Sequence, residues 1–338
     1  MSELRQDPVT GRWVVIATER AKRPESFSQR HEKLVRTKAI CPFCYGSEDM
    51  TPPEVLAFRP ESGKPNTSGW KVRVVPNKFP AFTMGNKSEV SMLGMQENLG
   101  IYLRMQGLGV HEVIVNSPDH FKSLALLTED EVGLVIDAYR SRLLDIKNNP
   151  GVEYVLIIVN HGKEAGTSIE HSHSQLFGTP IIPPLITEEL NGSRSYFHEK
   201  GRCVFCDILS EELGLNERII LESENFLVFS PYAARQPFET WIIPKRHSAN
   251  FESISSIEKK DFAFVLKNTL LKIYDGLNDS PYNFYLHTSP YKVDTGKFYH
   301  WHLEIFPKLS IQAGFEMGSG TMINVAFPEE SAKFLRNF

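Results

Sequence analysis

The strongest constraint on this chain is a set of metal-ligand residues that occurs twice in the same order. Each half contains a C-x-F-C pair, then an isolated histidine shortly after a proline, then a strand-like segment with H-x-H. The two sets are Cys41, Cys44, His120, His171 and His173, and then Cys203, Cys206, His247, His300 and His302. Such a shared order indicates an internal duplication. The longer gap between Cys44 and His120 indicates a loop insertion in the first copy.

The cysteines predict metal sites rather than disulfides. All four lie in the two C-x-x-C pairs, a usage typical of thiolate ligands in a reducing compartment. Zinc takes four ligands in a tetrahedron, which two cysteines of a turn and two distant histidines can complete. We therefore expect two zinc sites, formed by Cys41, Cys44, His120 and His171, and by Cys203, Cys206, His247 and His300. His111 is an alternative to His120, although its separation from His171 fits the repeat less well.

The hydrophobic periods predict strands and helices in each copy. Strands are expected at VEYVLIIVN, FLVFSPY, TWIIP and NFYLHTS, and helices at TEDEVGLVIDAYRSRLLDIKNN, which Thr128 caps, and at SIEKKDFAFVLKNTLLKIYDGL. The pattern breaks at PIIPP and NGSRS, between residues 180 and 200. We expect an α+β protein of two domains, residues 1–190 and 191–338, each an antiparallel sheet with a helix packed on one face.

The stretch IEHSHSQ places His171, His173 and Gln175 on one face of a strand, because side chains alternate along it. If His171 binds metal, His173 is free to act as a nucleophile. Neutral imidazole attacks phosphorus well, and the resulting phosphorus–nitrogen bond is labile enough to pass the group onward. Gln175 can donate a hydrogen bond to a phosphoryl oxygen without adding negative charge.

The segment just before this strand, residues 160–168, is suited to an anion. Glycines at 162 and 166 let backbone amides approach a phosphate, and Thr167 and Ser168 add hydroxyl groups. The second copy has no such loop, and Glu304 stands in the position of Gln175, where it would repel a phosphate. We therefore assign the chemistry to the first copy, with His173, Gln175 and Ser168 as the catalytic residues.

Composition restricts the partners. The net charge is −4 and the isoelectric point is near 6.3, so no overall basic field favours nucleic acid or an anionic membrane. No apolar run has membrane-spanning length, and the polar start lacks the apolar centre of a signal peptide, so we expect a cytoplasmic protein.

In a non-catalytic alternative, two zinc-ribbon-like modules bind RNA or protein. It requires basic, aromatic-rich surface near each cysteine pair, and the sequence around Cys203 offers little.

Taken together, these residues resemble the galactose-1-phosphate uridylyltransferase family of the histidine triad superfamily, over nearly the whole chain. The resemblance rests on R-A-K-R-P at residues 20–24, C-x-x-C at 41–44, S-P-D-H at 117–120, Asn160 with G-x-S and H-x-H-x-Q, and G-F-E at 314–316. It implies substrate-binding roles for Arg20, Arg23, Asn77, Asn160, Gly166, Thr167, Phe315 and Glu316.

The resemblance also implies a reaction. In a ping-pong sequence His173 takes a uridylyl group from UDP-glucose, releases glucose 1-phosphate and passes the group to galactose 1-phosphate, within a homodimer with shared active sites. The chain has Asn77-Lys78 where many relatives have an N-D pair that contacts the nucleoside. Ser172 between the histidines, together with GFEMGSGTMIN, is also similar to the branch that contains ADP-glucose phosphorylases, which use plain phosphate. Some relatives place a second metal on residues that correspond to Glu189, His287, His300 and His302, an alternative to the second cysteine site.

Overall fold

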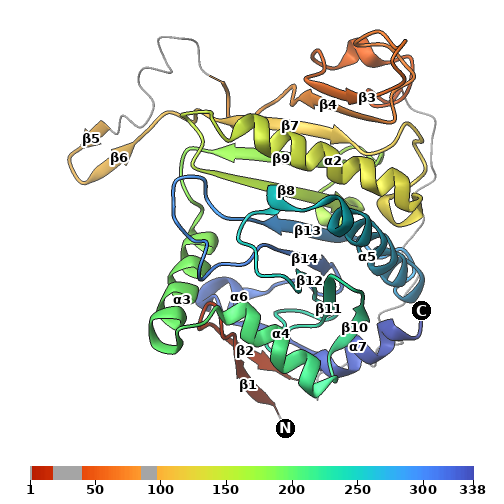
Figure 1. Cartoon of the computed structure of the whole chain (residues 1–338). Helices are drawn as coiled ribbons and strands as arrows, with labels where there is room; N and C mark the ends of the chain where they lie inside the picture. The colour runs from red at the N-terminus through yellow and green to blue at the C-terminus, as the bar shows by residue number, and fades with distance from the viewer. Residues whose placement is uncertain (1, 18–39, 85–96) are drawn as a thin grey trace.

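Strands from both halves of the chain form one continuous antiparallel sheet of ten strands (Figure 1). The structure is a computed structural model, and it describes residues 2–17, 40–84 and 97–338. From one edge to the other, the strands are β10 (Ile219–Glu222), β11 (Phe226–Phe229), β12 (Thr240–Pro244), β14 (His302–Pro307), β13 (Tyr282–His287), β8 (Tyr154–His161), β9 (His173–Thr179), β7 (Val110–Val115), β4 (Val72–Pro76) and β3 (Leu56–Phe58).

The sheet is built as two matching halves that meet at its centre. Outward from the centre, the first half runs β8, β9, β7, β4, β3 and the second runs β13, β14, β12, β11, β10, so each strand has a counterpart in the same place. The central strands β8 and β13 pair directly, with Asn160 opposite Asn283. The predicted α+β architecture and duplication are confirmed, and the two expected sheets are fused into one.

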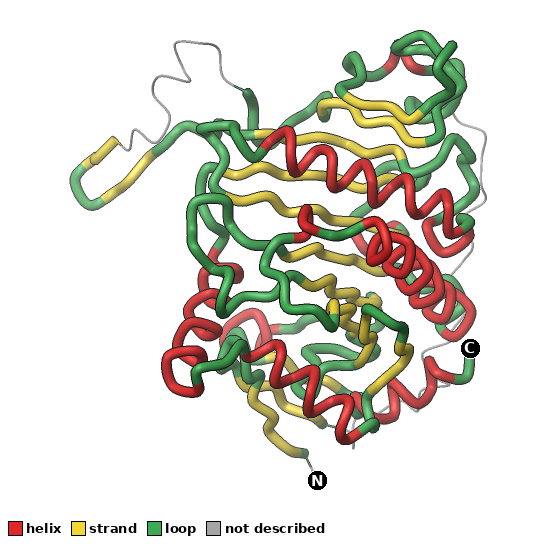
Figure 2. Tube along the Cα trace, viewed as in Figure 1, coloured by secondary structure: helices red, strands yellow, loops and turns green. Residues whose placement is uncertain are grey.

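Two long helices cover one face of the sheet (Figure 2). They are α2 (Glu129–Ile146) and α5 (Ser256–Gly276), which join β7 to β8 and β12 to β13 and pack against each other. Each begins with a capping box, Thr128 with Glu131 and Ser255 with Glu258, which satisfies two free backbone N–H groups. Buried apolar residues three and four apart then face the sheet, so the sequence periods predicted both helices correctly.

The opposite face carries α3 (Pro184–Lys200) and α4 (Val204–Leu215), which pack on Leu227, Phe229 and Trp241. The NGSRS segment, predicted to interrupt regular structure, lies inside α3. Gly192 is there because the helix crosses the backbone of Val9, where a Cβ atom at position 192 would come within 1.7 Å of the carbonyl oxygen. The expected domain boundary at residue 190 falls in this helix, and the division into two domains stays a prediction.

The two ends of the chain meet in a small second sheet. The strand β2 (Trp13–Ile16) lies between β1 (Glu3–Gln6) and β15 (Met322–Asn324). Two helices, α6 (Gly314–Ser319) and α7 (Pro328–Arg336), flank β15 in sequence. The hairpin of β5 (Glu97–Leu99) and β6 (Tyr102–Arg104) projects from the body (Figure 1).

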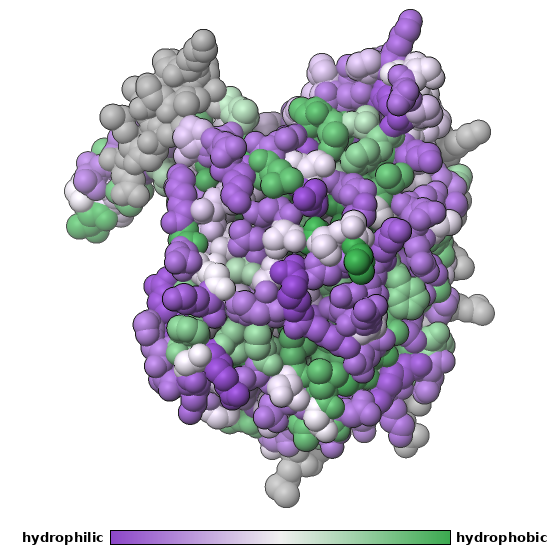
Figure 3. Space-filling model, viewed as in Figure 1, coloured by the Kyte–Doolittle hydropathy of each residue, from purple (hydrophilic) through white to green (hydrophobic). Residues whose placement is uncertain are grey.

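Hydrophilic side chains cover most of the face shown in Figure 3, whereas the hairpin tip is hydrophobic. Leu99, Ile101, Tyr102 and Leu103 are all exposed there. Among the described helices, none is long and apolar enough to cross a membrane.

Candidate active site and metal centres

The first predicted metal set comes together at the start of β9. One ligand atom each from Cys41, Cys44, His120 and His171 lies within 4.8 Å of the other three. The Sγ atom of Cys44 is 3.4 Å from Nδ1 of His120 and 3.5 Å from Nδ1 of His171. A zinc tetrahedron with its usual bond lengths has sulfur–nitrogen edges of about 3.5 Å, so this donor set fits zinc. His111 lies elsewhere, against Gln175.

The second predicted set, Cys203, Cys206, His247 and His300, has the same arrangement. Both sets use Nδ1 of the histidines, because the Nε2–H group of each inner histidine donates to a backbone carbonyl. His171 donates to Ser117 at 2.7 Å, and His300 donates to Pro244 at 2.8 Å. Such second-shell hydrogen bonds fix the ring and leave the other nitrogen bare for a metal.

Burial and hydrogen bonding also shift the pKa values of these cysteines and histidines. Burial lowers the pKa of His171 to about 4, so the ring is neutral as a metal ligand must be. Burial raises the pKa of Cys44 to about 11, whereas a hydrogen bond from Cys203 lowers the pKa of Cys206 to about 3. A cation between the sulfurs would stabilise the thiolates in both places.

A third buried group lies beside the second set. It consists of Glu189, His287, His302 and Glu304, whose ligand atoms lie within 4.8 Å of one another. The alternative site inferred from the family used His300 instead of Glu304. In the structure His300 lies with the cysteines, and Glu304 occupies the fourth position of this group. This third group could also hold a metal ion.

His173 begins β9 on the face opposite α2, two residues after the metal-site histidine. Its Nδ1–H group donates to the carbonyl oxygen of His171 at 2.8 Å, so Nε2 carries the free lone pair. The side chain is largely buried, and its ring centroid is 5.2 Å from that of Phe43. Burial lowers the pKa of His173, which keeps the imidazole neutral and nucleophilic at neutral pH.

Gln175 follows two residues later on the same face. Its Oε1 atom is 3.0 Å from Nε2 of His111 on the neighbouring strand β7. The predicted nucleoside residue Asn77 lies at the same point, with Nδ2 3.0 Å from Nε2 of His111. Gln175, His111 and Asn77 therefore form one polar cluster beside His173, and the part played by His111 was missed in the sequence.

The glycine-containing loop connects β8 to β9 at the junction of the two halves. Gly162 and Gly166 both have positive φ, at 81° and 90°, a conformation that favours glycine. Asn283, from β13 of the second half, donates both to Oδ1 of Asn160 at 2.7 Å and to the carbonyl oxygen of Ala165 at 2.8 Å. A residue of the second half thus fixes this loop.

The remaining predicted site residues are exposed, make only local contacts, or lie outside the described residues. Ser168 is exposed at the end of the loop, and Thr167 bonds locally to the carbonyl oxygen of Ile169 at 3.1 Å. Phe315 is exposed on α6, and Glu316 accepts a hydrogen bond from Ala313 at the start of that helix. These local contacts do not join α6 to the His173 cluster. Arg20 and Arg23 lie outside the described residues.

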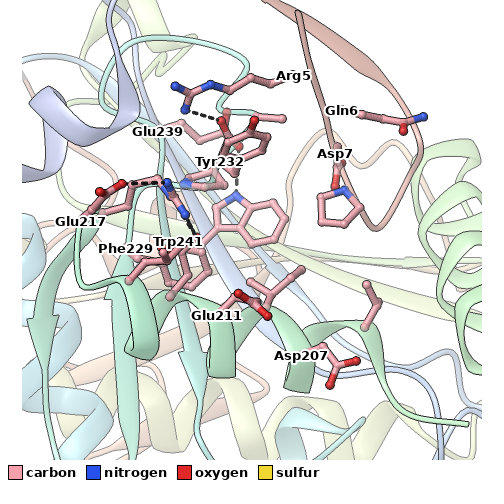
Figure 4. A pocket seen from close by; sticks show the side chains of 18 of the residues that line it. Arg5, Gln6, Asp7, Asp207, Glu211, Glu217, Phe229, Tyr232, Glu239 and Trp241 are labelled. Carbon is pink, nitrogen blue, oxygen red and sulfur yellow. Dashed lines mark hydrogen bonds and ion pairs between the residues drawn. The ribbon is translucent and has the colours of Figure 1, made fainter. Parts of the chain in front are cut away.

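A cavity of about 700 Å³ lies on the equivalent sheet face of the second half (Figure 4). Phe229, Glu239 and Trp241 line it, and the counterpart of the nucleophile, His302, is buried under Trp241 at 5.2 Å between ring centroids. Seven acidic residues but three arginines line the cavity, a charge that disfavours phosphate. The seven are Asp7, Asp207, Glu211, Glu212, Glu217, Glu239 and Glu329. This cavity therefore does not mark the site of phosphate chemistry.

The fold and the site define a class of protein: a fused two-repeat sheet with two Cys₂His₂ groups, in which the H-x-H strand of the first half carries the neutral histidine His173 after a glycine-containing loop. The model of the galactose-1-phosphate uridyl transferase N-terminal domain matches residues 1–183, and that of the C-terminal domain matches residues 189–323. The chain therefore belongs to the galactose-1-phosphate uridylyltransferase family and is a nucleotidyltransferase of that family.

Relatives of this chain include enzymes with two different activities. The ADP-glucose phosphorylase of Arabidopsis thaliana is 39% identical over 99% of this chain and 92% of its own length. The galactose-1-phosphate uridylyltransferase of Thermotoga maritima is 31% identical over 99% of this chain and 98% of its own. The crystal structure of the Arabidopsis phosphorylase with bound ADP-glucose, 37% identical, superposes with a TM-score of 0.83 and covers 100% of this chain and 99% of that one.

Proposed function

We propose that this protein transfers a nucleotidyl group from a nucleotide sugar through a covalent intermediate on His173. The observation that carries the proposal is the bare Nε2 atom of a neutral imidazole whose Nδ1–H group is already bonded. Nε2 attacks the α-phosphorus, a phosphorus–nitrogen bond forms, and the bond from phosphorus to the bridging oxygen breaks. Sugar 1-phosphate leaves, and an acceptor phosphate oxygen then attacks phosphorus and restores the free imidazole.

The residues around His173 supply binding and charge stabilisation. The Gln175 amide and the backbone of the Gly162–Gly166 loop donate to phosphoryl oxygens, where negative charge develops in the transition state. Asn160 and Asn77 bind the nucleotide part, and Thr167 and Ser168 add hydroxyl donors. Zinc held by Cys41, Cys44, His120 and His171 braces the strand that carries His173, and zinc at the second cysteine set braces the second half.

For the substrate, we propose ADP-glucose with inorganic phosphate as acceptor. This rests on the Arabidopsis phosphorylase, which is similar over almost the whole chain and whose structure contains ADP-glucose. The second candidate is UDP-glucose with galactose 1-phosphate, which the Thermotoga relative supports. In either case we propose a homodimer in which α6 of one subunit, with Phe315 and Glu316, completes the site of the other, and a cytoplasmic location.

The test is intact-protein mass spectrometry after mixing with ADP-glucose or with UDP-glucose. An added adenylyl group from ADP-glucose, removed on addition of phosphate with formation of ADP, supports the phosphorylase proposal. A uridylyl group removed by galactose 1-phosphate supports the second candidate instead. No adduct with either sugar, in protein that retains its metal, would contradict the covalent mechanism.

A further inference from the structure

The imidazole of His111 is held on three sides. Its Nδ1 atom accepts a hydrogen bond from the backbone N–H group of Ala81 at 3.0 Å, and its ring stacks on Phe177 with centroids 4.1 Å apart. Its Nε2 atom is 3.0 Å from Oε1 of Gln175. None of these contacts involves a metal set, so the ring has a purpose other than ligation.

The contact with Ala81 fixes the tautomer. A backbone N–H group can only donate, so Nδ1 of His111 must be bare and the single hydrogen of the neutral ring must be on Nε2. Burial lowers the pKa of His111 and so favours this neutral form. Placing the hydrogen on Nδ1 instead would oppose two N–H groups at 3.0 Å.

The tautomer in turn fixes the amide of Gln175. Nε2–H of His111 needs an acceptor, and the amide offers only its carbonyl oxygen. The NH₂ group is then the free end of the side chain. Nδ2 of Asn77 lies 3.0 Å from the same Nε2 atom and would oppose its hydrogen, so this tautomer requires the Asn77 amide to turn and give up its bond from the N–H group of Phe79. The N–H group of Ala81 decides the tautomer, because a backbone donor cannot turn as a side-chain amide can.

We propose that His111 is a positioning residue that holds the Gln175 amide with its NH₂ group turned toward the phosphoryl group on His173. The proposal rests on the proposed function and deepens it. A freely rotating glutamine would present its oxygen to the phosphate part of the time, and two oxygens repel. Fixing the amide removes that orientation before substrate arrives, which is the advantage of a preorganised donor.

The second half shows that these two strand positions are locked there as well. Val113 pairs with Gln175 in the first half, and Trp241 pairs with Glu304 in the second, so Glu239 is the counterpart of His111. There Arg235 bridges the two carboxylates at 2.8 and 2.7 Å. The side chain at this strand position is therefore held in both halves, through Arg235 for the carboxylate of Glu304 and by direct contact with His111 for the amide of Gln175.

The test is a double-mutant cycle with His111→Phe, which keeps a ring on Phe177 but removes both nitrogens, and Gln175→Ala. Single-turnover formation of the His173 adduct is measured with ADP-glucose and with UDP-glucose, together with zinc content and the unfolding temperature. We expect His111→Phe to slow this step by about 5- to 50-fold with little change in KM. In the Gln175→Ala background the same change should have no further effect. His198→Phe, on the exposed side of α3, is the matched control and should react as the wild type does.

Equal rates for the wild type and His111→Phe, or effects that multiply in the double variant, would overturn the positioning role. Absence of an adduct in the wild type would instead contradict the proposed function. Nitrogen-15 NMR of the histidine-labelled wild type tests the tautomer without any variant. A neutral ring with hydrogen on Nε2 is expected for His111, and hydrogen on Nδ1 would overturn the inference.

Discussion

The Nδ1 atom of His173 lies 2.8 Å from the backbone carbonyl oxygen of His171, so the proposed metal ligand also orients the proposed nucleophile. The start of β9 thus provides both a proposed metal ligand and the proposed nucleophile. The second half repeats the relationship, with Nδ1 of His302 at 3.0 Å from the carbonyl oxygen of His300. What differs is access, because His302 is fully buried whereas His173 retains some exposure.

This division of labour predicts opposite phenotypes for the two histidines. His173→Gly should abolish nucleotidyl transfer but keep zinc and fold, and added imidazole should restore some turnover by filling the cavity. His171→Gly should lose metal from the first site, stability and activity together. Activity, metal analysis and thermal unfolding of both variants decide the matter. If the His173 variant lost zinc while the His171 variant lost only transfer, the assignment would be wrong.

Metal content is the second prediction. The purified protein should carry about two equivalents of zinc, one for each Cys₂His₂ set. Cys203→Ser should remove one equivalent and lower the free energy of unfolding by several kcal/mol, yet leave the reaction type unchanged. Elemental analysis of wild type and variant checks this. One equivalent of zinc in the wild type would contradict a zinc ion at the second cysteine set. A third equivalent that stays bound in Cys203→Ser would indicate that the group of Glu189, His287, His302 and Glu304 holds metal.

Asn283 gives a prediction about the glycine-containing loop that connects β8 to β9. Its one NH₂ group donates both to Asn160 and to the carbonyl oxygen of Ala165, so Asn283→Asp keeps the shape but replaces this double donor with one oxygen that repels both acceptors. We expect KM for the nucleotide sugar to rise by about 5- to 100-fold, equivalent to about 1–3 kcal/mol for unpaired polar groups. Steady-state kinetics test it, with Asn268→Asp on the exposed side of α5 as control. An unchanged KM would show that the loop is held by other contacts.

The sequence predicted some parts of this molecule well for physical reasons. Each metal set depends on residue type and order, and α2 and α5 depend on a local cap and a 3.6-residue period. The fusion of β8 to β13 could not be predicted, because it depends on pairing between segments more than a hundred residues apart. The roles of Asn283 and His111 follow from that pairing and from strand register, so they emerge only with the fold.

The cap of α5 predicts a dependence of stability on pH. A hydrogen bond from Arg246 lowers the pKa of Glu258 to about 2, at N–O distances of 2.6 and 3.0 Å. A depressed carboxyl pKa stabilises the fold above the unfolded pKa of about 4.3, and that contribution is lost as pH falls toward 2. Because Arg246 is half exposed, we expect about 1–2 kcal/mol.

Urea unfolding of the wild type and Glu258→Gln at pH 7, 5 and 4 measures this contribution. The variant should be less stable at pH 7 and 5, and the difference should begin to narrow at pH 4. Glu131→Gln changes the matching cap of α2, whose described bonds go to Thr128, and should cost less than Glu258→Gln at pH 7. A difference between wild type and Glu258→Gln that grew as the pH fell would contradict the assignment.

Gly192 provides the last prediction, because it lies in the interior of a helix where glycine normally weakens stability. An added Cβ atom would lie 1.7 Å from the carbonyl oxygen of Val9, so α3 or the N-terminal segment would have to move. Gly192→Ala should therefore destabilise the protein by at least about 2 kcal/mol. Gly133→Ala in α2 is the matched control, since nothing lies within 4 Å of its added Cβ, and it should stabilise by about 0.5–1 kcal/mol. Urea unfolding measures both, and stabilisation by both alanines would show that α3 and Val9 do not touch in solution.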